Sequence, residues 1–190
     1  MRYLKIIFLI IIIYSFFPSF AQSKTFHLGL KLEFYGYTLN EVSDYKTYSK
    51  KFTLSPLPSF YVIISKDLSE SFSLSLKPGV LVGPEYFTGL ELGFLLNDKI
   101  YKDKLFLSGG INIHFINDTE DGHSFRRTSD IIYFIILGTG YRLTDRLSID
   151  ICFHQALNKK FGYTYGSFPG DASGPSEIPN MLKIGFSATL

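Results

Sequence analysis

The sequence predicts an all-β fold, an eight-stranded antiparallel up-and-down β-barrel, on three observations. Eight segments alternate apolar and polar residues with a period of two, which is typical of strands that have one apolar face. No helical segment is expected among them. The connections between the segments are mostly brief at one end and long at the other, as in a barrel whose two ends differ.

Residues 1–21 have the features of a secretory signal peptide. Arg2 and Lys5 form a basic start, residues 6–17 form an apolar run, and the closing Ser-Phe-Ala is the small-residue motif that signal peptidase reads. The apolar run has 12 residues, whereas a transmembrane helix needs about 20. We therefore expect cleavage after the signal, export, and a β-barrel domain over residues 22–190.

Composition excludes several classes of protein. Removal of the signal leaves 190 − 21 = 169 residues, enough for one domain of ordinary size. The signal carries two of the 19 basic residues, so 17 basic and 17 acidic residues remain, and a neutral chain does not suggest a nucleic-acid partner. Cys152 is the single cysteine, so an internal disulfide is excluded although the chain is exported.

The segment from Asp130 to His154 contains the clearest hairpin pattern. The apolar faces of its two halves coincide only if facing residues keep the same parity. A three-residue loop that pairs Leu143 with Leu147 satisfies this condition, so we predict an antiparallel hairpin with its turn at residues 144–146. In the second half, an apolar face made of Leu147, Ile149, Ile151 and Phe153 lies opposite Ser148, Asp150, Cys152 and His154.

The other strands follow the same pattern along the chain. Prolines at 56 and 58 weaken a run that begins at Phe52, so the firm part of the second strand starts at Ser59. The eight strands are predicted over residues 26–35, 59–65, 71–77, 87–96, 105–115, 130–143, 147–154 and 181–190. The three long connections are predicted as loops over Thr38–Lys50, Asn117–Ser129 and Asn158–Pro179.

The polar faces of the strands have the composition of a narrow lumen. A water-facing sheet usually carries long hydrated residues, whereas these faces are mostly glycine and serine with single charges. An eight-stranded interior has room for side chains and little else, and an unpaired charge there would cost several kcal/mol. We therefore predict a plugged lumen in which charges neutralise one another. The polar network is predicted to consist of Lys31, Glu33, Lys77, Glu91, His114, Arg142, Asp150, His154 and Lys183.

The apolar faces are nearly free of charge along every strand, as contact with lipid requires. Aromatic residues gather toward both ends of these faces, and Phe and Tyr form the two belts because the chain has no Trp. The expected belts are Phe34, Phe52, Phe115, Tyr133 and Phe153 at the long-loop end, and Phe72, Phe94 and Tyr141 at the short-turn end. The barrel is thus predicted to span a lipid bilayer.

These features resemble those of the small eight-stranded bacterial outer membrane barrels, such as the transmembrane part of the OmpA family and the broad outer membrane protein beta-barrel domain family. The resemblance covers Ser23–Leu190 and rests on the signal peptide, the hairpin sequence GYRLTDRLSID and the amphipathic last strand. It implies insertion by the barrel assembly machinery. Barrels of this group usually end in an aromatic residue that helps this recognition, whereas the present chain ends in Leu190.

No residue pattern points to catalysis, a cofactor or a metal. His114 and His154 are placed in the lumen, whereas the resembling membrane-embedded lipid A deacylases, which use a Ser-His-acid site, act from an outward-facing site. The acidic run Asn117–Gly122 lacks the remaining ligands of a calcium loop. Arg126 and Arg127 beside it would balance it or touch lipopolysaccharide phosphates. We therefore expect no catalytic, cofactor-binding or metal-binding residues.

We expect a monomeric, non-enzymatic outer membrane barrel with a structural or interaction role, whose three long loops contact a ligand that the sequence does not identify. Its partners would be outer membrane lipid and lipopolysaccharide, with no nucleic acid. Tyr35, Phe87, Phe106 and Phe134 would share the lumen with the charges, so permeation would be slight. Two alternatives stay open: a barrel enzyme acting on lipid as a deacylase or acyltransferase, and a secreted lipocalin-like carrier.

Overall fold

The structure, a computed structural model, describes residues 26–43, 47–55, 57–83, 87–101, 104–117, 125–127, 129–164 and 174–190. The predicted signal peptide, residues 1–21, lies outside these ranges, as does the acidic run beyond Asn117. The described residues include no helix that is long and apolar enough to cross a membrane.

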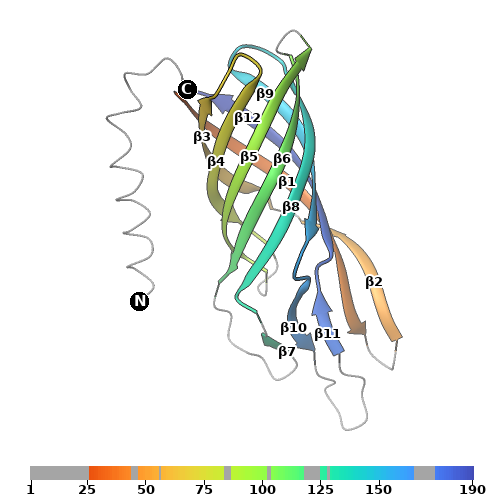
Figure 1. Cartoon of the computed structure of the whole chain (residues 1–190). Coiled ribbons are helices and arrows are strands. Elements are labelled where there is room, and N and C mark those ends of the chain that lie inside the picture. Colours follow the sequence, from red (N-terminus) through yellow and green to blue (C-terminus); the bar gives the residue numbers. More distant parts are fainter. Residues whose placement is uncertain are drawn as a thin grey trace, which may run out of the picture.

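Eight long strands form a closed antiparallel barrel (Figure 1), which confirms the predicted fold class. The sheet closes because the last strand pairs with the first, from Gly29 opposite Thr189 to Tyr37 opposite Met181. Neither strand keeps a free edge over that length. The barrel strands are β1 (Phe26–Ser43), β3 (Ser59–Asp67), β4 (Phe72–Leu81), β5 (Gly89–Tyr101), β6 (Leu105–Ile116), β8 (Ile131–Arg142), β9 (Leu147–Ala156) and β12 (Asn180–Thr189).

The turn between β8 and β9 has the three-residue form that parity predicts. The backbone N–H groups of Leu143 and Thr144 both donate to the carbonyl of Leu147, at 2.8 and 3.1 Å. The Thr144 hydroxyl oxygen accepts from the backbone N–H of Arg146 at 3.2 Å and of Leu147 at 3.0 Å, which stabilises the reversal. This turn lies at the end of the barrel where the C-terminus also lies (top of Figure 1).

Four shorter strands extend the wall beyond the opposite end of the barrel (bottom of Figure 1). β2 pairs with the distal half of β1, β11 pairs with β1 at Asn40 opposite Glu177, and β10 joins β11 to β7. Short turns at one end and longer excursions at the other are the usual asymmetry of outer membrane barrels, with the short turns in the periplasm. The extension strands are β2 (Thr47–Leu54), β7 (Phe125–Arg127), β10 (Lys160–Thr164) and β11 (Gly174–Glu177).

The prediction that the three long connections are loops was wrong for most of their described length. In Thr38–Lys50, β1 continues to Ser43 and pairs there with Thr47 of β2. β7 lies within Asn117–Ser129, and β10 and β11 lie within Asn158–Pro179. These strands rise past the apolar outer band, where neither face must be apolar, so their sequences lack the alternation that revealed the barrel strands.

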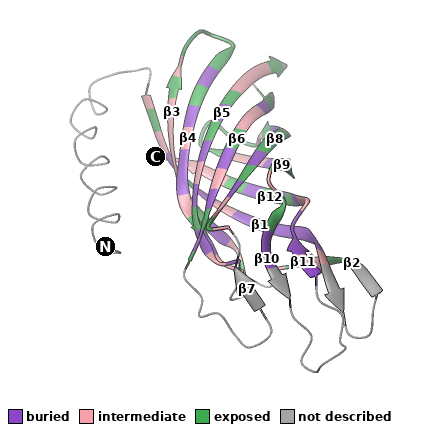
Figure 2. Cartoon of the chain, turned by 60° about the horizontal axis from the view of Figure 1, so that its bottom comes forward, coloured by how far each residue is buried: buried purple, intermediate pink, exposed green. Residues whose placement is uncertain are grey.

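The barrel is apolar outside and partly charged inside. Figure 2 shows exposed and buried residues alternating along the strands; in β1, Leu30 is 52% exposed whereas Lys31 is 7% exposed. This orientation excludes the lipocalin-like alternative, in which the apolar face would line the interior, and it suits contact with lipid. The predicted belt residues are all exposed, namely Phe34, Phe52, Phe72, Phe94, Phe115, Tyr133, Tyr141 and Phe153.

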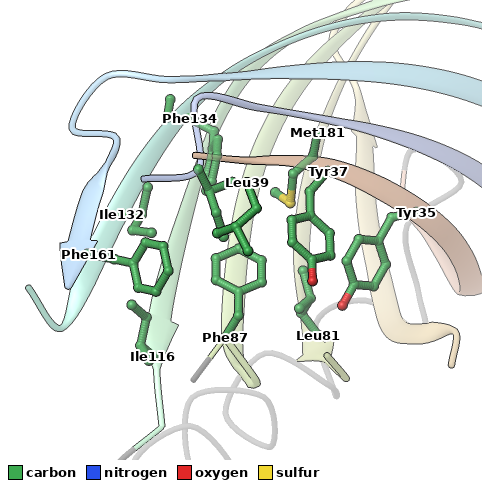
Figure 3. Packing of buried hydrophobic residues seen from close by; sticks show 12 residues of the cluster. Tyr35, Tyr37, Leu39, Leu81, Phe87, Ile116, Ile132, Phe134, Phe161 and Met181 are labelled. Carbon is green, nitrogen blue, oxygen red and sulfur yellow. The ribbon is translucent and has the colours of Figure 1, made fainter. Parts of the chain in front are cut away.

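The lumen is polar over only part of its length. Toward the extension strands it is filled by buried apolar side chains (Figure 3), among which Phe87 stacks on Tyr37 with 5.9 Å between ring centroids. A polar interior throughout was therefore an incomplete interpretation. We name this group the apolar cluster; it consists of Tyr35, Tyr37, Leu39, Leu81, Phe87, Ile116, Ile132, Phe134, Ala156, Phe161, Ile178 and Met181.

The apolar outer face predicts a depth-dependent response to charge. Leu137, at the middle of β8, is 65% exposed, and Leu157, just beyond β9, is 64% exposed. Leu137→Arg should lower the free energy of folding into lipid vesicles by about 2–4 kcal/mol, because an arginine then enters hydrocarbon. Leu157→Arg, the matched control, should change it by less than about 1 kcal/mol. Equal effects in urea titrations of the two variants would contradict a lipid-facing exterior.

Candidate functional site

Three lysines and three carboxylates cross the middle of the lumen. We name them the charge network. Each occupies an inward position of its strand, and none is more than 7% exposed. Five strands contribute to the network, so its geometry depends on the closed barrel. Its members are Lys31 and Glu33 on β1, Lys77 on β4, Glu91 on β5, Asp150 on β9 and Lys183 on β12.

Glu33 is the centre of the network. The Lys77 ammonium donates to Glu33 Oε1 at 2.7 Å, and Lys31 Nζ lies 2.9 Å from the same oxygen. Lys31 also donates to Asp150 Oδ1 at 2.8 Å, and Lys183 Nζ lies 3.5 Å from Glu33 Oε2. One carboxylate thus contacts all three ammonium groups. It links β1 to its neighbour β12 on one side and, across β3, to β4 on the other.

A second junction forms around Glu91. Lys183 donates to Glu91 Oε2 at 2.6 Å and to the Tyr61 hydroxyl oxygen at 2.9 Å, while the Tyr61 hydroxyl donates to that same Glu91 oxygen. Lys77 Nζ also lies 4.4 Å from the centre of the Tyr61 ring, within cation–π range. Tyr61 on β3 therefore joins the two carboxylate centres.

The network is electrically balanced. Its three ammonium groups match its three carboxylates, so the buried set carries no net charge. Burying these ions is costly, and only close pairing with further hydrogen bonds offsets the cost. Loss of one partner should thus destabilise the barrel more than loss of both partners of a pair.

Two glycines make room for the long side chains. A Cβ atom on Gly185 would lie 2.3 Å from Lys31 Cε and 2.8 Å from Asp150 Oδ1. A Cβ atom on Gly79 would lie 2.1 Å from Cδ1 of Tyr61. The glycine-rich polar face seen in the sequence is therefore the counterpart of the bulky charged and aromatic residues beside it.

Asn112, His114 and His154 are fully buried, and their side chains have no hydrogen-bond partner among the described residues. His114 Nδ1 is 3.6 Å from Glu91 Oε1, beyond hydrogen-bond distance. The His154 ring lies edge-on to Phe134, with 6.0 Å between ring centroids. Neither histidine is hydrogen-bonded to a described serine, so the described residues do not assemble a Ser-His-acid site.

Arg142 is separate from the charge network. It lies at the short-turn end of β8, where it lines a cavity of about 300 Å³ that opens at the periplasmic mouth. We name this cavity the vestibule. The predicted polar network therefore falls into three groups: the six charges of the charge network, the two buried histidines, and Arg142 in the vestibule. Phe106 also lines this vestibule, whereas Tyr35, Phe87 and Phe134 belong to the apolar cluster.

No group of three or more His, Cys, Asp or Glu side chains that could hold a metal occurs in the described part of the chain. Cys152 is buried, and its Sγ lies 3.5 Å from Asp150 Oδ1. Its contacts are those of a small side chain in the lumen wall.

Sequence reasoning missed Tyr61 and most of the apolar cluster. Tyr61 lies in the firm part of the second predicted strand, but residues 60–64 are all apolar or aromatic, so alternation did not show which face was inward. Residues 131–137 are apolar on both faces, which is typical of a strand buried on both sides. That run was the available signal for Ile132, which faces inward beside the correctly placed Phe134. Phe161 and Ile178 lie in a segment without periodicity, which carried no signal.

Removing one lysine should test the balance of the network. Lys183→Met leaves Glu91 without its ammonium partner and should lower the free energy of unfolding in detergent micelles by about 3–5 kcal/mol. The double variant Lys183→Met/Glu91→Gln should recover at least half of that loss. Lys66→Met, at an exposed position of β3, is the control and should cost less than about 1 kcal/mol. Additive losses in the double variant would contradict the pairing.

No protein-family model matches the chain, and no curated protein matches it. Several solved structures do. The outer membrane protein AlkL, solved by solid-state NMR in DMPC bilayers, aligns over 87% of this chain and 90% of its own at 13% identity, with a TM-score of 0.51. OprG of Pseudomonas aeruginosa aligns over 89% and 98% at 10% identity, with a TM-score of 0.48. OprH of P. aeruginosa aligns over 87% and 99% at 15% identity, with a TM-score of 0.43.

At 13% identity, the likeness to AlkL is one of fold. The finer resemblance to the OmpA family stays a prediction. The apolar outer face supplies what the likeness alone does not, because a closed sheet with leucine and phenylalanine outside is built for lipid. Fold and surface together make this chain a small outer membrane β-barrel protein.

Proposed function

We propose that this protein is a closed, non-enzymatic outer membrane barrel that acts as a monomer through the strands extending from its outer end. The observation that carries the proposal is the double filling of the lumen. The charge network occupies its middle, and the apolar cluster occupies its outer half. The barrel is then a rigid stem that presents its extension strands outside the cell.

The two fillings resist permeation for different physical reasons. Glu33 and Glu91 hold their lysines at 2.6 to 2.9 Å, so an ion passing this level would have to separate buried pairs. In the apolar cluster, Phe87 is fully buried and lies 4.5 Å from the His114 ring and 6.2 Å from the Phe161 ring. Most side chains packed at that level are apolar, so an ion entering it would lose most of its hydration. Eight strands leave little space for a route around either filling.

The extension strands supply surface for contacts outside the membrane. Pairing runs in the order β2, β1, β11, β10, β7, so β2 and β7 are the edge strands of the described extension. Lys50 and Lys51 of β2 are exposed, followed by Phe52 and Leu54 at 57% and 71% exposure. Cationic side chains next to exposed apolar ones fit the surface of lipopolysaccharide, where phosphate and acyl groups lie close together. Outer membrane lipid and lipopolysaccharide are thus the proposed partners, and the barrel assembly machinery the proposed route of insertion.

The proposal predicts that breaking the charge network alone will not open the barrel. Lys183→Met/Glu91→Gln keeps the apolar cluster, so its conductance in planar lipid bilayers should stay at the level of the unmodified protein. Addition of Phe87→Ala and Phe134→Ala should raise conductance above that of either parent, because both fillings are then disturbed. A heat-dependent gel shift confirms that each variant is folded. Ion channels of stable size in the unmodified protein would overturn the proposal.

A second prediction concerns lipid chemistry. His154 is fully buried against Phe134, so substrate could reach it only through the packed lumen. Expression of the unmodified protein in outer membranes should leave the acylation pattern of lipid A unchanged in mass spectra, and His154→Ala should give the same spectrum. A change of acyl chain number that appears with the unmodified protein and disappears in folded His154→Ala would establish the enzyme alternative.

A further inference from the structure

The periplasmic end of the lumen contains a polar cavity that the closed-barrel function does not use. The vestibule has a volume of about 300 Å³, and its inner end is bounded by Lys31, Lys77 and Asp150 of the charge network. Its walls carry serine, threonine and asparagine side chains from β3, β4, β5, β6, β9 and β12. A space of this size accommodates a small polar solute.

One wall of the vestibule is a connected row of hydrogen-bonding side chains across four adjacent strands. Ser65 and Ser75 oxygens are 2.8 Å apart, Asn97 Nδ2 donates to Ser75 Oγ at 2.9 Å, and Ser108 Oγ donates to Asn97 Oδ1 at 2.7 Å. The four side chains supply five hydrogens. Three contacts use three of them, so 5 − 3 = 2 hydrogens have no acceptor within the row.

The charged groups around the vestibule also offer more hydrogen-bond donors than acceptors to a ligand. Asp150 already accepts from Lys31, and Asp67 already accepts from His27 at 3.0 Å and from Lys99 at 3.3 Å. At the mouth, Lys99, Arg142 and Arg146 stand against Asp67 and Asp145, an excess of 3 − 2 = 1 positive charge with His27 neutral. The charge network above adds nothing to this sum, because it is balanced.

Among the three cations at the mouth, Lys99 is paired with Asp67 and Arg146 is exposed, which leaves the half-buried Arg142. Its half-buried side chain lines the vestibule, and its guanidinium has no hydrogen bond or ion pair with any described side chain. The backbone of Arg142 is fixed, since its N–H donates to the Lys104 carbonyl at 2.7 Å. Gly140, one inward position further in, gives the Phe106 ring its space, because a Cβ there would lie 2.1 Å from the ring. The guanidinium therefore lies at the wall of a donor-rich cavity, without an anionic partner among the described side chains.

We propose that the vestibule is a binding site for a phosphate-type oxyanion that enters from the periplasm, with Arg142 as its principal ligand and the serine–asparagine row as supporting donors. A guanidinium binds such an anion through two parallel hydrogen bonds. The tetrahedral anion has further oxygens for the hydrogens left over in the row. Lys77 lines the inner end and donates to Glu33 alone among the hydrogen bonds described, so its ammonium has further hydrogens to offer there, although its charge is balanced by Glu33. The anion can be free phosphate, the phosphate of a small solute, or a lipid headgroup that reaches the mouth.

Titration with inorganic phosphate tests the site. In protein refolded in zwitterionic detergent, phosphate should shift the amide NMR signals of Ser75, Asn97, Ser108 and Arg142 along one saturable curve. Arg142→Gln should weaken binding by about tenfold or more, as expected for loss of a charge-assisted partner. Lys104→Gln removes an exposed positive charge beside the start of β6, next to the Arg142 backbone, but Lys104 does not line the cavity. This variant should change the affinity by less than about twofold.

Two further measurements separate the outcomes. Ser108→Ala, a smaller change in the row, should also weaken phosphate binding, which keeps the test informative if Arg142→Gln does not fold. Nanodiscs with anionic phospholipid and no added phosphate should leave the same amide signals unshifted if the ligand is a solute; shifts there would assign the same site to a headgroup. Two results would overturn the proposed site: Lys104→Gln weakens phosphate binding as much as Arg142→Gln does, or phosphate shifts only the amide signals of the exposed turn at residues 144–146. Either result would show general attraction of phosphate to the basic mouth.

Discussion

Closure of the sheet between β1 and β12 is the constraint on which the other features depend. Nine consecutive residue pairs, from Gly29 with Thr189 to Tyr37 with Met181, join the two ends of the barrel sequence. A sheet without free edges satisfies its own backbone hydrogen bonds, which is the condition for a strand structure to stand in hydrocarbon. Closure also converts the alternation along each strand into an inside and an outside. Lys31 therefore faces the lumen, and Leu30 faces the lipid.

Narrowness is the second consequence of eight strands. The lumen must be filled by side chains, and the chain fills it differently at three depths. Near the periplasm, serine, asparagine and Arg142 surround a polar vestibule. In the middle, balanced lysines and carboxylates pair at short distances. Toward the extension strands, aromatic and aliphatic side chains pack against one another. Each layer is paired with glycines or small residues on neighbouring strands, such as Gly185 beside Lys31.

The three layers assign different roles to residues of the same type. Lys77 and Lys183 stabilise the barrel because carboxylates surround them, whereas Arg142 is available to a ligand because none contacts it among the described side chains. His114 and His154 lie against aromatic rings at the inner limit of the apolar cluster, and His114 also lies beside Glu91, as alternation predicted. Composition alone would treat all these groups as one polar interior. The position of each group along the barrel axis decides whether it stabilises the barrel, as Lys77 and Lys183 do, or can bind a ligand, as we propose for Arg142.

The sequence by itself determined the number of barrel strands, their faces, the β8–β9 turn and the inward position of every member of the charge network, because a period of two is a local property that survives in any register consistent with closure. Only the tertiary structure decided which lysine meets which carboxylate, since Glu33 and Lys77 are brought together by strand order and stagger rather than by spacing along the chain. It also decided the extension strands and the apolar cluster. Outside the lipid band no face must be apolar, and Phe161 and Ile178 become core residues only because β10 and β11 continue the wall beyond the barrel and bring both residues into the apolar cluster.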